Sequence, residues 1–216
     1  MRSSSSQQSE SELVVSQQLG STAPSLSPKL SMVSLGCPKN TVDGEVMLGD
    51  LYRQGFDITD EHEEADAIVV NTCAFVEDAK MESIEAIVEA AQLKQTGKAK
   101  KIVVTGCLAQ RYSEELADQL PEADLVVGFE QYTGLPAAIR SSLGLNAGVD
   151  ATEYAQRSRV QVGTATVPFR PEFDRFRLTP SHTAYLRVAE GCDHACTFCA
   201  IPGFRGRFRS KGYSTS

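Results

Sequence analysis

The sequence predicts an α/β fold built on an open parallel sheet, because short apolar runs alternate with stretches of helical periodicity. Three β-prone apolar runs are each followed at once by a small or polar turn and a cysteine. These cysteines are Cys37, Cys73 and Cys107, at intervals of 36 and 34 residues, the length of one strand–helix–loop unit. Strands that alternate with helices form parallel sheets with right-handed crossovers, so we expect a flavodoxin-like or Rossmann-like sheet.

The elements of this sheet follow one another along residues 30–143. Strands are expected at 30–35, 67–70, 101–104 and 124–127. The first two helices cover 42–51 and 84–91, where apolar residues recur every three to four positions until a glycine at 55 and at 97 stops each run. A third helix should begin with Ser113 as its N-cap and end before Pro121, and a fourth passes through Leu135 and Ile139.

The first three cysteines are expected to share one site. All the strands of a parallel sheet end at the same edge, and ligands bind in the crevice there. Cys37, Cys73 and Cys107 each come directly after a strand, so they should lie about one or two strand spacings of ~4.8 Å apart. Three thiolates favour an iron–sulfur cluster with one iron left open. The alternative is that each is a buried small apolar residue, which is common for free cysteine.

A second cysteine group lies near the carboxyl end of the chain. Cys192, Cys196 and Cys199 form a C-x3-C-x2-C array, which a single short loop can bring onto one metal. Three thiols favour a cubane cluster with an open iron, because a structural zinc site needs four donors. Zinc stays an alternative, with His182 or His194 as the fourth ligand.

Composition limits the function classes. The chain has 216 residues, 41% of them hydrophobic, a net charge of −7 and no apolar run long enough to span a membrane. An acidic protein is not expected to bind DNA or other nucleic acid unspecifically, and six irregularly spaced cysteines favour a reducing compartment. The basic residues Arg205, Arg207, Arg209 and Lys211 are expected to form a solvated face, with a binding role as the alternative.

We expect four segments. Residues 1–30 are Ser- and Gln-rich and predict a disordered leader, with an organelle transit peptide as the alternative. Residues 31–144 form the α/β domain, and 145–180 form a linker in which phenylalanines at 169, 173 and 176 hold the chain against a domain surface. Residues 181–216 begin a second domain, with its first strand at 183–189.

Four stretches of the chain resemble the methylthiotransferase family of radical S-adenosylmethionine (SAM) enzymes. They are SLGCPKNTVDGEVM at 34–47, VVNTCAFVEDAKMESIEAI at 69–87, IVVTGCLAQRY at 102–112 and AYLRVAEGCDHACTFCAIPGFRGRFRSK at 184–211. The Cys-Pro-Lys-Asn at 37–40 is most similar to the branch that modifies ribosomal protein S twelve. The resemblance covers residues 30–211, and it implies that 181–216 begin a radical SAM (βα) barrel that is not completed here.

The resemblance also implies a mechanism. Two 4Fe-4S clusters and SAM would serve as cofactors. The Cys192, Cys196 and Cys199 cluster would cleave SAM to form a radical, with Phe198 next to the cofactor. The Cys37, Cys73 and Cys107 cluster would carry the sulfur that becomes a methylthio group on the β-carbon of an aspartate.

Partners and location follow from the same resemblance. The substrate would be ribosomal protein S twelve, and the electron donor a flavodoxin or ferredoxin. The enzyme would be cytoplasmic, or in a plastid or mitochondrion if the leader is a transit peptide. We expect no turnover by these 216 residues alone. A transfer-RNA methylthiotransferase and a non-catalytic iron–sulfur protein remain the alternatives.

Overall fold

The computed structural model describes residues 27–145, 158–165 and 175–210. Within them, six parallel strands form one sheet in the order β2-β1-β3-β4-β5-β6. The strands are β1 (Lys29–Ser34), β2 (Asp57–Ile58), β3 (Ala67–Thr72), β4 (Lys101–Gly106), β5 (Leu125–Val127) and β6 (Val160–Gln161). The first five have the flavodoxin-like order, in which the chain reverses direction across the sheet between β1 and β3. The expected open parallel α/β sheet is confirmed.

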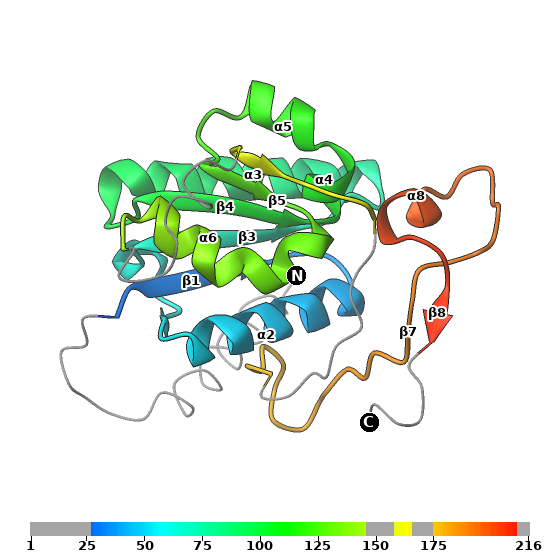
Figure 1. The fold of residues 1–216 in the computed structure, drawn as a ribbon, viewed down its shortest axis with the longest axis horizontal. Helices are drawn as coiled ribbons and strands as arrows, with labels where there is room; N and C mark the ends of the chain where they lie inside the picture. The colour runs from blue at the N-terminus through cyan, green and yellow to red at the C-terminus, as the bar shows by residue number, and fades with distance from the viewer. Residues whose placement is uncertain (1–26, 146–157, 166–174, 211–216) are drawn as a thin grey trace, which may run out of the picture.

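Helices cover both faces of the sheet. Figure 1 shows α2 (Pro38–Arg53) and α6 (Leu135–Ser142) in front of the sheet and α3 (Glu77–Thr96) behind it. The shorter helices are α4 (Cys107–Arg111), α5 (Ser113–Gln119) and the 3-10 turns η1 (His62–Glu64) and η2 (Phe129–Gly134). None of the described helices is long and apolar enough to cross a membrane.

The core lies along the central strands. Every residue of β3 is buried, which explains why its first four residues form a continuous apolar run rather than an alternating one. Ile68, Val69 and Val70 have no exposed surface, and each contributes about 1.5–3 kcal/mol by leaving water. This burial fixes the sheet, and with it the positions at which the strands end.

Two parts of the predicted linker lie against the α/β unit. Residues 160–161 form the sixth strand, β6, beside β5. Farther along, the buried Glu45 of α2 accepts hydrogen bonds from the Leu178 amide (3.0 Å) and from the Arg175 guanidinium. Phe176 is buried, with its ring 6.3 Å from that of Tyr52. The predicted packing role is confirmed for residue 176, and positions 169 and 173 lie outside the described residues.

The carboxyl-terminal segment lies beyond the ends of the sheet strands (Figure 1). It contains β7 (Ala189–Glu190), α8 (Ile201–Arg205) and β8 (Arg209–Ser210). The strand expected at 183–189 is wrong in extent and pairing, because only β7 is a strand there and it pairs antiparallel with β8. The barrel itself and the domain limits stay predictions, and most of the predicted leader, residues 1–26, lies outside the described residues.

Candidate metal centres

Three neighbouring strands deliver the first cysteine set. Cys37 is the N-cap residue of α2 after β1, Cys73 follows β3, and Cys107 is the first residue of α4 after β4. Because β1, β3 and β4 are adjacent in the sheet, the expected common edge is confirmed. Cys37 is exposed, whereas Cys73 and Cys107 are both buried.

Cys73 is held by its backbone and by close packing. Its amide donates to the hydroxyl of Ser83 on α3, and that hydroxyl lies 2.9 Å from the Cys73 carbonyl. On the other side is Gly36, which precedes Cys37 and has a φ of 93°. A Cβ at Gly36 would lie 2.8 Å from the Cys73 Cβ and 3.0 Å from its Sγ. Only glycine therefore lets the β1 turn approach the second cysteine this closely.

Cys107 lies at the most enclosed place on this edge. Burial raises the pKa of its thiol to about 11, and the nearby Arg205 guanidinium opposes that rise. Its Sγ is 3.7 Å from Asn40 Oδ1 and 3.5 Å from Arg205 Nη2. The preceding Gly106 has a φ of 93°, and a Cβ there would lie 2.3 Å from the Thr72 carbonyl oxygen. The backbone before this cysteine therefore also requires glycine.

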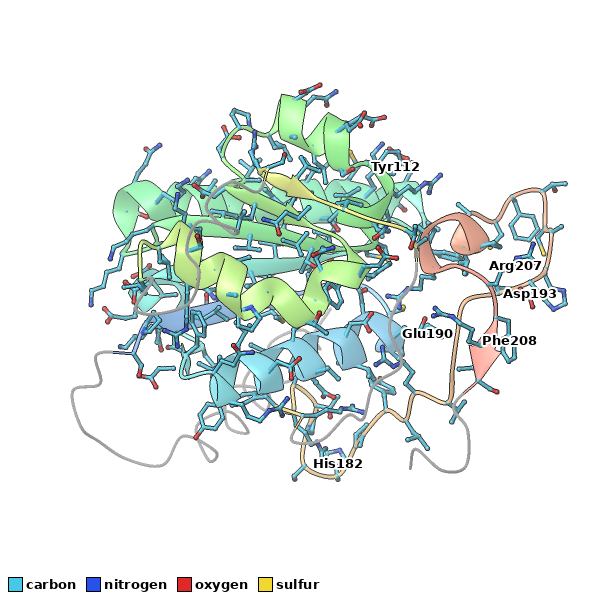
Figure 2. The ribbon with its side chains drawn as sticks, in the orientation of Figure 1. Tyr112, His182, Glu190, Asp193, Arg207 and Phe208 are labelled. Atoms are coloured by element: carbon cyan, nitrogen blue, oxygen red, sulfur yellow. The ribbon has the colours of Figure 1, made fainter. Side chains whose placement is uncertain are left out.

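The second cysteine set lies on a loop whose two ends are joined. The pairing of β7 with β8 and the hydrogen bond from the Cys192 amide to the Gly206 carbonyl (3.1 Å) close its neck. The Phe208 amide also donates to Asp193 (3.0 Å), and Figure 2 shows both residues beside Arg207 on this loop. A hollow of about 480 Å³ is lined by all three cysteines together with Asp193, His194 and Arg207. One loop thus gathers Cys192, Cys196 and Cys199 around one space.

Two other predicted residues lie away from this hollow. Phe198 is 90% exposed and is not among the residues that line it. Its place next to a cofactor stays a prediction. His182 lies far from the loop in Figure 2, beyond α2, so this structure does not bring it to the cysteines as a fourth zinc ligand.

In neither set do the side chains converge on a single point. Among the described residues, no three His, Cys, Asp or Glu side chains are close enough together to hold a metal ion. The elements bring the cysteines of each set to one edge or one loop, and ligation requires their side chains to turn inward. The ligand assignments therefore stay predictions.

The sequence did not reveal the buried polar network between the two sets. Asn40 donates to the carbonyls of Leu35 (2.9 Å) and Thr72 (2.8 Å), and so ties together the ends of β1 and β3. Its Oδ1 accepts from Arg205 Nη2 (2.9 Å), which also donates to Asp43 (2.9 Å). Arg205 is 3% exposed, so the expected solvated face is wrong for this residue. The motif Cys-Pro-Lys-Asn was the one signal, but it did not show what Asn40 would contact.

The buried charges of this network are balanced, and the half-exposed Lys39 adds one cation 3.7 Å from Glu190. Arg187 Nη1 lies 2.5 Å from Asp43 Oδ1 and 3.6 Å from Glu190 Oε1, and Arg205 Nη1 lies 3.4 Å from Glu190. Burial raises the pKa of Asp43, and Arg205 and Arg187 oppose the rise. Two guanidinium groups thus face two carboxylates where water is excluded.

Comparison with known proteins agrees with this arrangement. Residues 29–128 match the family described as "Uncharacterized protein family UPF0004". The chain is 45% identical over 183 residues to a protein named ribosomal protein uS12 methylthiotransferase RimO from Geobacter sulfurreducens. Proteins of the same name from Desulforamulus reducens and Clostridioides difficile are 46% and 43% identical over 184 and 185 residues. These alignments cover 85–86% of this chain. The resemblance to the methylthiotransferase family is confirmed by these matches.

The chain spans 39% of the length of each of those three relatives. Its donor atoms fit the cofactors that the resemblance implied, because both sets consist of thiols, which iron–sulfur clusters require. Gly36 and Gly106 add backbone that approaches the first set more closely than any other residue would allow. Both observations concern residues of this chain and do not depend on the names of its relatives.

Proposed function

We propose that this chain is part of an enzyme that adds a methylthio group to the β-carbon of an aspartate in ribosomal protein uS12. The observation that carries the proposal is the 45% identity to relatives named uS12 methylthiotransferases, in a chain that places three thiols at neighbouring strand ends. No feature of the described residues favours transfer RNA over this substrate.

The two cysteine sets have different roles in this proposal. Cys37, Cys73 and Cys107 hold one 4Fe-4S cluster, and Cys192, Cys196 and Cys199 hold the other. When bound, these clusters supply the electron that cleaves SAM and the sulfur that is transferred. A flavodoxin or ferredoxin delivers that electron. The hollow beside the second set, which Arg207 also lines, receives SAM.

The polypeptide fixes the positions of the cysteines in the first set and excludes water from around Cys107. Asn40 fixes the ends of β1 and β3 relative to Cys107, and Ser83 fixes the backbone of Cys73. The side chains of Asp43, Arg187 and Arg205 are buried, and Arg205 lies 3.5 Å from the Cys107 sulfur, so this group of side chains keeps water from Cys107. Exclusion of water protects reactive intermediates from hydrolysis and strengthens the electrostatic contacts of the groups that it surrounds.

Iron counting tests the proposal. Anaerobic reconstitution with iron and sulfide should give about eight irons per chain, because each cluster takes about four. Replacing Cys37, Cys73 and Cys107 by alanine should leave about four, and so should the matched replacement of Cys192, Cys196 and Cys199. One equivalent of zinc with no iron would refute the assignment. The absence of turnover by the 216 residues alone stays a prediction.

The substrate requires a separate test. A protein with the full length of its relatives should be incubated with uS12 and, in parallel, with hypomodified transfer RNA. We expect mass spectrometry to find methylthio-aspartate in uS12 and no change in the transfer RNA. The opposite result would place the chain in the transfer-RNA branch while leaving the two cysteine sets as cluster ligands.

A further inference from the structure

Arg205 of α8 contacts four other elements, α2, α4, η2 and β7. Its Nη2 lies 2.9 Å from Asn40 and Asp43 of α2 and 3.5 Å from the Cys107 sulfur of α4. Its Nη1 lies 3.4 Å from Glu190 of β7, and its guanidinium carbon is 4.8 Å from the centre of the Phe129 ring. One buried side chain thus joins parts of the chain that are up to 165 positions apart.

These contacts fix both ends of the second cysteine loop. Glu190 comes two residues before Cys192, and Arg205 comes six residues after Cys199. Both are at most 3% exposed, and β7, β8 and the Cys192–Gly206 hydrogen bond close the neck beside them. The loop itself is open, since Cys196 is exposed. Its position relative to the sheet edge therefore depends on its anchored ends.

We propose that Arg205 is a positioning residue that sets where the Cys192–Cys199 loop lies relative to Cys107. The inference deepens the proposed function and rests on it, since it concerns the separation of the two sites named there. Arg205 does not act as a ligand or touch the reacting atoms. It acts through Glu190 on the loop and through Asn40, Asp43 and Cys107 on the sheet edge.

The geometry requires arginine and not just a positive charge. The two terminal nitrogens bind different groups, Nη1 the carboxylate of β7 and Nη2 the groups of α2 and α4, while the flat face lies over Phe129. Lysine offers a single nitrogen on a flexible stem and cannot make both sets of contacts with a fixed geometry. Stabilisation of the fold by the charge of Arg205 does not explain its place here, because a buried ion pair often stabilises a protein no more than apolar residues of similar volume do.

The first measurement uses the metal-free 216-residue protein with Arg205→Met, Arg205→Lys and the control Ser210→Ala, five residues away and exposed. Hydrogen exchange reports the loop, and iodoacetamide alkylation read by mass spectrometry reports Cys107. For both Arg205 variants we expect exchange over residues 189–210 and alkylation of Cys107 at least about tenfold faster, with β3 and β4 still protected. Ser210→Ala should match the unsubstituted protein. If Arg205→Met loses protection in β3 and β4 as well, the milder Arg205→Lys decides. Rates within about twofold of the unsubstituted protein in a folded Arg205→Lys would overturn the proposal.

The second measurement separates positioning from stability. After reconstitution, Arg205→Lys should keep about eight irons, because no ligand has been removed. Its electron paramagnetic resonance spectrum should nevertheless show a changed magnetic interaction between the two reduced clusters, since that interaction depends on their separation. An unchanged interaction at full iron content would overturn the role of Arg205 and leave the cluster assignment intact. Failure of the cysteine variants to change the iron count would instead refute the proposed function, while the metal-free results on loop placement would stand.

Discussion

Asp43 is the residue whose loss should disturb the buried network most. It lies between Arg187 at 2.5 Å and Arg205 at 2.9 Å, and its side chain is 1% exposed. The network contains two guanidinium groups and two carboxylates, Asp43 and Glu190, so Asp43→Asn leaves one positive charge buried without a counterion. Breaking a buried pair in this way costs about 3–5 kcal/mol.

Urea and thermal unfolding followed by circular dichroism measure this cost. For a chain of this size, 1 kcal/mol corresponds to about 2–4 °C in Tm, so Asp43→Asn should lower Tm by about 6–20 °C. Glu85→Gln on the exposed face of α3 is the control and should change the free energy of unfolding by no more than about 0.5 kcal/mol. A loss below about 1 kcal/mol in Asp43→Asn would refute the reasoning.

A double-mutant cycle sharpens the test. Arg187→Met alone leaves two buried carboxylates against one buried guanidinium, with the half-exposed Lys39 also near Glu190. Combined with Asp43→Asn, it leaves one buried carboxylate facing one buried guanidinium. The double variant should therefore be more stable than the sum of the two single losses predicts, by about 0.5–3 kcal/mol. Strict additivity would show that the two side chains do not interact as the structure indicates.

Two further predictions concern the sheet. Burial alone would raise the pKa of Asp124. Hydrogen bonds from Lys94, the Ile102 amide and Lys101 lower it by more than burial raises it, so the net pKa lies below its usual value. Because the folded-state pKa is lowered, this stabilisation is present above the unfolded pKa of about 3.9 and is lost as the pH falls through the folded value. In urea unfolding, Asp124→Asn should thus cost about 1–3 kcal/mol at pH 7 and progressively less as the pH falls below about 3.9, and a pH-independent loss would contradict this. Gly106→Ala should cost about 3 kcal/mol or more, because its Cβ would meet a carbonyl oxygen at 2.3 Å. Gly144→Ala, with a φ of 73° and nothing within 4 Å, should cost only about 1 kcal/mol, and equal losses in the two variants would show that the clash is relieved.

The sequence was sufficient to predict the central strands and the long helices, because their patterns are local. The strands at 67–72 and 101–106 each contain a buried apolar run. The helices α2 and α3 carry apolar residues at helical spacing over long stretches, α2 buried on most of its surface and α3 on one side. By contrast, β2 and β6 have two residues each and exist only because a neighbouring strand offers backbone partners. The five-residue helix that Cys107 begins carries no periodicity either.

The site residues also differ in whether a local pattern or a distant partner determines their position. The cysteines could be predicted because each follows a strand, and the order of parallel strands places their ends at one edge. Arg205 could not, since an arginine in a basic run is usually solvated, and its burial depends on Asp43, 162 positions earlier. The pairing of β7 with β8 was missed for a similar reason, because the alternating pattern at 183–189 indicates a strand without naming its partner.

The distance along the chain between Cys107 and Arg205 gives the order of events during synthesis. Arg205 is added 98 residues after Cys107, which at about 5–20 residues per second takes roughly 5–20 s. The strands that carry the first three cysteines are complete by then, so their edge emerges from the ribosome without the guanidinium that later covers Cys107. We expect cysteine reagents, and equally a cluster-delivering partner, to reach Cys107 readily on a chain stalled before residue 205 and more slowly on one stalled well beyond it. Equal alkylation of Cys107 in the two stalled chains would show that access to this cysteine does not change once Arg205 has been added.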